Sequence, residues 1–395
     1  MGGIDGIAET ADVLAGLDRD AVKRLLFDLI AIPSYGADED AIVRYLVKRF
    51  QAQGIPCRVT ELDGKGLNVV AEIGRGSKRI VLNSHLDVVP PGDPGAWATD
   101  PFTPIEKDGL VFGRGAEDAK GCLAAMIVAF EELAKRGPSL PARVALMAVG
   151  GEERGGVGSK AEVAKGFAAD AAIVGESTEL QPMMAHKGVL RLEVETVGRA
   201  AHASDPEAGI NAVVAMAPVI SALDKLAAQV RRRSEKHTGH ASLVISTISG
   251  GSALNVIPER CIISIDRRVL PNETETEATR EIVDVVNRAL PVELKAKVSV
   301  RKVRFVPPAL TDPGEAIVAA AEKAASAVLG RPAPAVGFPA TCDMTYLAND
   351  ARIPTVILGP GSLDVAHQAN EYIALDQVVL AARIYMKVID YWLAG

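Results

Sequence analysis

The sequence predicts an α/β protein in which a mostly parallel sheet, flanked by helices, is interrupted by an inserted ferredoxin-like α+β domain. Three observations predict this fold class. Residues 1–187 and 307–395 alternate helical periodicity with short apolar strands, which is the pattern of a buried parallel sheet. Residues 188–306 instead follow the order β-α-β-β-α-β. The chain of 395 residues is also too long for one ordinary core.

The elements of the first and last segments follow from side-chain spacing. Apolar residues recur at the three- and four-residue spacing of amphipathic helices over 22–30 and 42–50. Short apolar stretches predict buried strands at 68–73, 79–89, 143–149 and 171–176. A helix over about 117–136 joins the second of these strands to the third. The last segment adds a strand at 355–360 and helices over 314–329 and 375–393.

The inserted domain has a different pattern, because its strands alternate apolar and polar side chains. Its expected strands are 189–198, 241–251, 260–270 and 297–305, and its expected helices are 211–230 and 273–290. Such alternation is typical of a sheet with one solvated face. The exposed edge or the helices of this domain offer a surface for an oligomer contact.

Composition excludes several classes of partner. The net charge of −7 argues against nucleic acid or an anionic membrane, and no uninterrupted apolar run reaches the length of a membrane span. Residues 1–13 lack the basic and apolar blocks of a signal peptide. The four cysteines have no paired spacing, so we expect a reduced, cytoplasmic protein without structural disulfides.

Acidic and histidine side chains recur at the ends of the predicted strands. His85 and Asp87 end one strand, and residues two apart on a strand point to the same side, so these two side chains should converge. Further along the chain stand Asp118, Glu152, Glu153, Glu176 and His367. Each alone has a simple structural explanation, such as a helix cap for the aspartate in its glycine-rich turn. Their recurrence at the carboxyl edge of an open sheet predicts a ligand site.

The types of these residues indicate what the site binds. Two histidines and three carboxylates suit divalent Zn²⁺, Co²⁺ or Mn²⁺ and need no thiol. Two ions about 3.5–4 Å apart share one bridging carboxylate, and each takes a further histidine and acid. Such a centre uses five protein ligands, and a carboxylate that is not a ligand can serve as a base. The inventory is consistent with two divalent ions per chain, with Zn²⁺ preferred.

A series of short motifs runs in order along nearly the whole chain: SHLDVVP, GRGAEDAKG, GGEERGGVGS, VGEST, GRAAHAS, GGSALNVIP, IDRRVLP and H..NE. In this order they resemble the co-catalytic dinuclear-zinc metallopeptidase family of acetylornithine deacetylase, succinyl-diaminopimelate desuccinylase, aminoacylase and glutamate carboxypeptidase. The resemblance implies a zinc-exopeptidase-like catalytic domain formed by residues 1–187 and 307–395. It implies a dimerisation or lid role for residues 188–306.

The resemblance also implies which residue holds which ion. His85 and Glu176 would bind one ion, Glu153 and His367 the other, and Asp118 would bridge the two. The family further implies a cis peptide bond after the bridging aspartate.

Three residues are expected to act in catalysis. By the resemblance, Glu152 is the general base that takes a proton from the bridging water and passes it to the leaving amine. Asp87 would orient the metal-bound imidazole of His85. His202 would stabilise the oxyanion, in some family members from the partner subunit; without the motif it would be an ordinary surface histidine.

Substrate contacts are expected from three further residues. Asn255 and Arg268 resemble residues that hold the tetrahedral oxygen and a substrate carboxylate, and the alternatives are a turn residue and a solvated strand charge. Arg267 should face away from Arg268, because neighbours on a strand alternate. Thr341 falls in a loop that would line the pocket.

The function implied by the resemblance is hydrolysis of a C–N amide bond in a small N-acyl amino acid bearing a carboxylate. A metal-bound hydroxide would attack, as in deacetylases and desuccinylases of this family. The alternatives are a dipeptidase or carboxypeptidase, release of an unusual amine, or a non-catalytic binding protein that retains the fold. The presence of Glu152 and all five ligands weighs against the last. The expected partners are a small-molecule substrate and a second copy of the chain, bound through the inserted domain.

Overall fold

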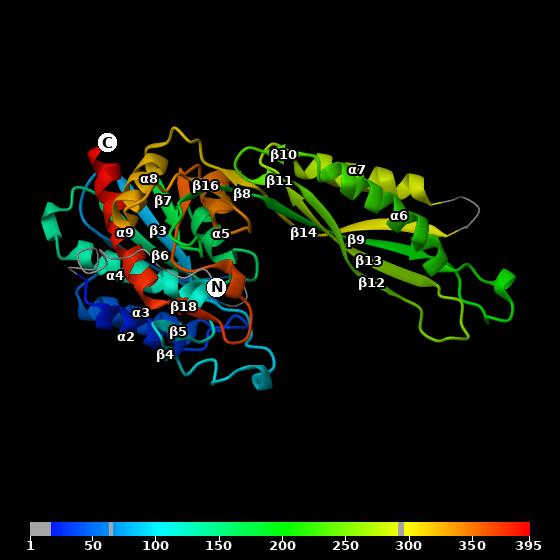
Figure 1. Cartoon of the computed structure of the whole chain (residues 1–395), viewed down its shortest axis with the longest axis horizontal. Coiled ribbons are helices and arrows are strands. Elements are labelled where there is room, and N and C mark those ends of the chain that lie inside the picture. The colour runs from blue at the N-terminus through cyan, green and yellow to red at the C-terminus, as the bar shows by residue number, and fades with distance from the viewer. Residues whose placement is uncertain (1–16, 63–65, 291–295) are drawn as a thin grey trace. The chain divides into compact units, whose positions relative to one another are not determined.

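The computed structural model describes residues 17–62, 66–290 and 296–395, which form two compact units (Figure 1). Unit 1 contains the residues up to Met184 together with Thr311–Val336 and Cys342–Gly395. Unit 2 contains Ala185–Leu310 and Gly337–Thr341, and the sequence did not indicate that this last short segment joins it. The expected absence of a signal peptide concerns residues 1–13, which lie outside the described part.

A mixed sheet forms the centre of unit 1, with strand order β1-β2-β6-β3-β7-β17. The bounds are β1 Cys57–Glu61, β2 Leu67–Ile73, β3 Arg79–His85, β6 Arg143–Val149, β7 Ala171–Val174 and β17 Thr355–Ile357. The last four strands in this order are parallel to one another, and β1 and β2 form an antiparallel edge. Nearly every residue of the parallel strands is buried, as in a sheet covered on both faces. The predicted α/β class is confirmed.

Six α-helices belong to unit 1 in the described part of the chain. They are α2 Arg19–Ile30, α3 Asp40–Ala52, α4 Gly121–Ala134, α5 Val157–Ala164, α8 Ala316–Leu329 and α9 Leu375–Ala394. Helix α4 is buried almost all round, because it lies against β3 and β6 and against α2 and α9. It begins at Gly121 rather than at 117, since Asp118 and Ala119 have non-helical backbone angles and are joined by a cis peptide bond, as the family resemblance implied.

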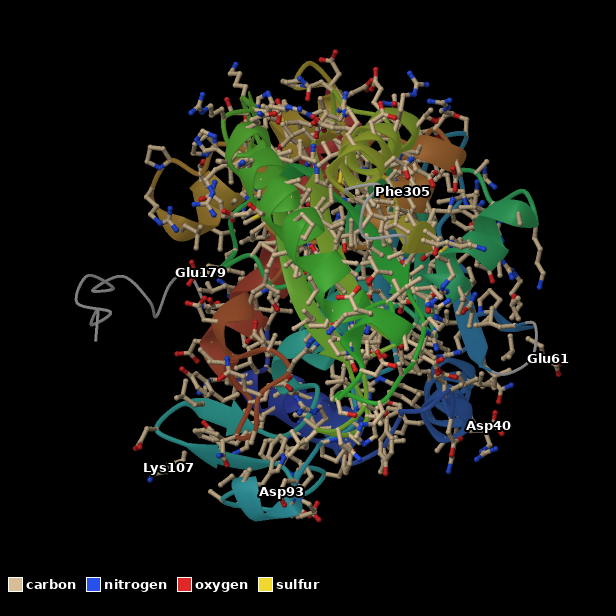
Figure 2. The ribbon with its side chains drawn as sticks, turned by 90° about the vertical axis from the view of Figure 1, so that its right-hand side faces the viewer. Asp40, Glu61, Asp93, Lys107, Glu179 and Phe305 are labelled. Atoms are coloured by element: carbon tan, nitrogen blue, oxygen red, sulfur yellow. The ribbon has the colours of Figure 1, made fainter. Side chains whose placement is uncertain are left out.

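A small antiparallel sheet of unit 1 has the order β18-β5-β4, with β4 Ile105–Lys107, β5 Leu110–Phe112 and β18 Tyr372–Ala374. Lys107 ends the outer strand, and its side chain points into solvent (Figure 2). Tyr372 pairs with Phe112, and the main-chain N–H of Gly113 donates to the carbonyl of Glu371 at 3.0 Å. This pairing brings the segments 113–118 and 367–371 side by side.

Unit 2 is built on an antiparallel sheet of order β12-β13-β9-β14, with β9 Gly188–Val197, β12 Ser242–Gly250, β13 Arg260–Val269 and β14 Lys297–Val306. Helices α6 Ala212–Val230 and α7 Glu275–Ala289 complete the predicted β-α-β-β-α-β order. The side chain of Asn211 caps α6, and a capping box of Thr274 and Glu277 starts α7. Short strands complete the described chain: β8 Met183–His186, β10 Ser234–Glu235, β11 Gly239–His240, β15 Ala309–Leu310 and β16 Val336–Phe338.

Helix α6 is long and apolar enough, by length and composition alone, to cross a membrane. Asp224 and Lys225 interrupt its apolar run, so the sequence predicts a helix here but no uninterrupted membrane span. In the structure one face of α6 packs in the core of unit 2 with apolar side chains of β9 and β13. The apolar character of this face is therefore accounted for by core packing.

Candidate metal centre

The candidate ligands of unit 1 lie where its parallel strands end. His85 is the last residue of β3, Glu153 follows β6 and Glu176 follows β7. Because β3 pairs in parallel with both β6 and β7, their carboxyl ends meet at one edge of the sheet. Asp118 lies in the turn before α4, and His367 lies in the loop between β17 and β18.

These side chains form two groups that share one aspartate. His85, Asp118 and Glu176 make up the first, and Asp118, Glu153 and His367 the second; within each group the ligand atoms lie within 4.8 Å of one another. Asp118 Oδ1 is 2.9 Å from Nε2 of His85, and Asp118 Oδ2 is 3.0 Å from Nε2 of His367. Nε2 of His367 also lies 2.9 Å from Glu153 Oε1. Each oxygen of the aspartate therefore faces one group, as a bridging carboxylate requires.

The donor atoms fit divalent cations of the Zn²⁺ type. Each group offers one imidazole nitrogen and carboxylate oxygens, and the shared aspartate serves both. The acids are buried or partly buried, and such a concentration of carboxylates is costly unless cations compensate it. The five residues that the sequence predicted as ligands are thus together in space, while the identity of the ion stays a prediction.

The charges of this cluster shift its protonation strongly. Burial lowers the pKa of His85, but the hydrogen bond and charge of Asp118 outweigh it and hold that pKa well above its usual range. Hydrogen bonds with Asp118 and Glu153 raise the pKa of His367 to about 10. Burial raises the pKa of Asp118, but hydrogen bonds from His367 and His85 more than reverse this and lower it. Metal ligands must be deprotonated, so cation binding here would release protons.

Glu152 differs from its neighbour Glu153 in its surroundings. Burial, followed by the charges of Glu176 and Asp343, holds the pKa of Glu152 well above its usual range. Burial likewise raises the pKa of Glu176. Glu152 is in neither ligand group, so its carboxyl group is available to exchange protons. The role of Glu152 as general base stays a prediction.

Asp87 holds the turn that carries the two glutamates. Its Oδ1 accepts from the main-chain N–H groups of Gly151 at 2.7 Å and Glu152 at 3.0 Å, and its Oδ2 accepts from that of Glu153 at 3.2 Å. Its main-chain carbonyl lies 2.8 Å from Nδ1 of His85, whereas the carboxylate is 3.8 Å from that nitrogen. The hydrogen bond that orients His85 thus comes from the main chain of Asp87. Nδ1 of His85 and Oδ1 of Asp87 lie 3.8 Å apart and both side chains are buried, so the two converge as expected, although β3 itself already ends at His85.

Other side chains hold the same turn, and the sequence did not indicate them. Asn68 Oδ1 accepts from the N–H of Gly150 at 3.0 Å. The guanidinium of Arg154 pairs with the buried Glu39 at 2.9 Å. The hydroxyl of Tyr346 donates to the carbonyl of Gly155 at 2.8 Å. These partners lie far away in the chain, so no local motif reveals them.

Two further residues near Asp118 were also missed. Glu371 stands inside the H..NE motif and Arg114 inside GRGAEDAKG, but neither was given a role. Both are buried, and they form an ion pair with each other. Both residues stand in the motifs of the sequence, but the 257 positions between them hide their pairing from any local pattern.

The remaining predicted residues belong to unit 2, or to its short segment in the case of Thr341. His202 is exposed, and its Nδ1 lies 2.7 Å from the hydroxyl of Ser204. The carbonyl of Asn255 accepts from the N–H of Ala203 at 2.9 Å, so His202 and Asn255 lie on neighbouring segments. Arg268 is half-buried on β13 and pairs with Asp266 at 2.9 Å. Their roles toward substrate stay predictions.

The alternation expected for the two arginines of β13 is confirmed. Arg267 is fully buried in unit 2 and pairs with Glu273 at 2.6 Å. The four cysteines are free thiols, as expected, and burial holds the pKa of Cys342 well above its usual range. A neutral, buried thiol of this kind packs in the interior and is not an activated nucleophile.

The chain is similar to known proteins over most of its length. The family model described as Peptidase family M20/M25/M40 matches residues 81–391. The acetylornithine deacetylase of Proteus mirabilis (strain HI4320) is 32% identical over 363 residues, which cover 87% of this chain and 90% of that protein. The probable succinyl-diaminopimelate desuccinylase of Staphylococcus aureus (strain MSSA476) is 27% identical over 400 residues, covering 93% and 94%.

Solved structures share the fold over most of the chain. A tripeptidase from Staphylococcus aureus has a TM-score of 0.79 at 24% identity, covering 96% of this chain and all of that one. The YXEP protein of Bacillus subtilis, described as a dinuclear metal binding peptidase from the M20 family, has a TM-score of 0.72 at 17% identity, covering 94% and 97%.

The two ligand groups and the relatives of the chain define the class of protein as a metal-dependent amidohydrolase. Within this class the chain belongs to Peptidase family M20/M25/M40, which confirms the family resemblance of its motifs.

Proposed function

We propose that this protein hydrolyses the amide bond of a small N-acyl amino acid, in the manner of an acetylornithine deacetylase or a succinyl-diaminopimelate desuccinylase. The observation that carries the proposal is the similarity to a deacetylase along nearly the whole chain, at 32% identity. Glu152 is close enough to Glu176 and His85 of the first group and to Glu153 of the second to feel their charges, which supports an active enzyme rather than a binding protein.

The residues of unit 1 have distinct tasks in this proposal. When bound, two divalent ions, Zn²⁺ by preference, would polarise the scissile carbonyl and lower the pKa of a water molecule. Glu152 takes a proton from that water and passes it to the leaving amine. Asp118 and the other four ligands hold the cations, and Asp87 keeps the turn of Glu152 and Glu153 in place through its three main-chain contacts.

The test is a substrate panel with the metal-loaded protein. N-acetyl and N-succinyl amino acids and dipeptides are assayed with added Zn²⁺, Co²⁺ or Mn²⁺, and again after removal of metal by a chelator. We expect turnover of at least one N-acyl amino acid that is lost with the metal and regained on its return. Absence of turnover across the panel, with two ions bound per chain, would favour a binding protein.

A second candidate is a peptidase of small peptides. It is supported by the structural similarity to a tripeptidase, although at 24% identity this similarity shows the fold alone. The same panel separates the two: a kcat/KM for dipeptides or tripeptides above that for every N-acyl amino acid would favour the peptidase. An amide of an aromatic amine, added to the same panel, tests the release of an unusual amine.

We also propose a cytoplasmic homodimer that forms through unit 2. In support, β12 is an edge strand of its sheet and carries the exposed apolar residues Val244 and Ile248, and α6 exposes Val213 and Val214. An uncovered edge of this kind readily pairs with a second copy. Ile248→Lys should convert the dimer to a monomer in light scattering after gel filtration, whereas Val336→Lys, an exposed site in unit 1, should not.

A further inference from the structure

Glu371 is a buried carboxylate that the proposed chemistry does not use. It is 1% exposed, and both of its oxygens have partners. Its Oε1 accepts from the main-chain N–H groups of Glu117 at 2.8 Å and Asp118 at 3.0 Å. Its Oε2 accepts from the guanidinium of Arg114, which is 2% exposed and lies over the ring of Trp97.

These contacts meet a need of the local backbone. Asp118 lies in an irregular turn before α4, so the N–H groups of this turn lack the partners that a regular helix supplies. Buried N–H groups without a partner cost about as much as a lost hydrogen bond. The carboxylate of Glu371 accepts hydrogen bonds from two of them. It thereby fixes the backbone at Asp118 and so the direction in which the side chain of Asp118 projects.

The same residue is tied to the loop of His367. Only three residues separate them, and the loop bends sharply, since His367 and Asn370 both have positive φ angles, of 62° and 61°. The side chain of Asn370 fixes the loop to residues 96–98, accepting from the N–H of Ala98 at 2.7 Å and donating to the carbonyl of Ala96 at 3.0 Å. Glu371 then joins this loop to the turn of Asp118.

From this arrangement we infer that Glu371, held by Arg114, is a positioning residue that sets the distance between Asp118 and His367. The second ligand group contains both of these residues, whereas the first group contains Asp118 but not His367. Loss of Glu371 should therefore weaken the cation position formed by Asp118, Glu153 and His367 more than the position formed by His85, Asp118 and Glu176. The inference rests on the metal centre of the proposed function.

The test measures Zn²⁺ affinity rather than activity. Glu371→Gln is titrated with Zn²⁺ against a competing chelator, beside the wild type and beside His367→Ala, which identifies the dissociation constant of the second position. A buried group that holds a metal ligand typically contributes 10–100-fold in affinity. We expect Glu371→Gln to raise the dissociation constant of the second position about 10–100-fold and that of the first position less.

The matched control is Glu131→Gln. Glu131 is also a buried carboxylate of unit 1 paired with an arginine, Arg49, through hydrogen bonds of 2.6 and 2.8 Å, but it contacts no ligand segment. If Glu371 has a purely structural role, both variants lower the unfolding midpoint. Neither variant then changes either Zn²⁺ dissociation constant selectively. Unchanged constants in Glu371→Gln, or equal changes in Glu131→Gln, would overturn the inference.

Glu371→Gln leaves the buried Arg114 charged and without its carboxylate partner. A second variant is therefore measured in case Glu371→Gln folds poorly. Arg114→Met combined with Glu371→Met removes that buried charge together with the acceptor oxygens, and the same selective loss at the second position is expected. Both Zn²⁺ constants at wild-type values in this double variant would contradict the inference. The wild-type titration keeps the two proposals apart: fewer than two ions bound by the wild type would contradict the proposed metal centre instead.

Discussion

The two units hold their candidate functional side chains in different ways. In unit 1 the turns of Glu153 and Asp118 are bound through their main-chain N–H groups by the buried carboxylates of Asp87 and Glu371. In unit 2 His202 and Asn255 are exposed on irregular segments. The imidazole of His202 is hydrogen-bonded to the hydroxyl group of the nearby Ser204. Metal ligands must keep their mutual distances within a few tenths of an ångström. A group that meets only the substrate can be held less tightly.

The largest expected effect in this comparison lies at Glu152 itself. Glu152→Gln removes the proton acceptor without shortening the side chain, so kcat should fall about 10³-fold or more, while two ions per chain are retained. The matched variant Glu153→Gln removes a ligand and should lose metal. Metal analysis of both proteins after dialysis checks this. Loss of an ion from the first variant and not from the second would mean that the two roles are reversed.

His202→Ala tests the less tightly held group of unit 2. If His202 donates to the oxyanion, kcat should fall by about 10²–10³-fold, while metal content and unfolding midpoint stay at wild-type values because the side chain is exposed. His240, an exposed histidine of the same unit, provides the control variant His240→Ala. Equal activity of the two variants would make His202 an ordinary surface residue.

Asp87→Asn should have an effect of about 10–100-fold on Zn²⁺ affinity or kcat. The amide has one acceptor oxygen, so one of the N–H groups now bound by the carboxylate would meet an NH₂ group instead. Asp170 is a control at the other end of β3, where it accepts from the N–H of Arg79 at 2.7 Å. Asp87→Asn with full affinity and activity would show that the turn holds its shape without the charge.

The smallest expected effect is a pH dependence of folding in unit 2. Burial lowers the pKa of His186 to about 4, so between about pH 4 and 6.5 the unfolded chain binds a proton there that the folded chain does not. Stability from this group is complete above pH 6.5 and declines as the pH falls, by about 2 kcal/mol between pH 6.5 and 5. Denaturant unfolding of the wild type and of His186→Phe over this range measures the difference, and parallel pH profiles would contradict it.

Sequence reasoning succeeded where a feature was local or repeated. The parallel strands of unit 1 and the order of elements in unit 2 follow from side-chain periodicity, and the five candidate ligands recur at strand ends within motifs. It failed at irregular backbone: α4 begins after the cis peptide at Asp118, and β3 ends before Asp87. It also missed Glu371, since the partners Arg114 and Asp118 lie more than 250 residues away in the chain. No spacing rule encodes such a contact.

The carboxylates of Asp87 and Glu371 have a consequence for how the protein acquires its cations. Each binds main-chain N–H groups and needs no ion to do so. The turns that carry Glu153 and Asp118 can therefore adopt their shape as the chain folds, unlike small zinc domains in which the metal drives folding. Metal loading therefore need not precede the folding of these two turns. Which divalent ion the centre prefers would then be set by its imidazole and carboxylate donors rather than by a requirement of folding.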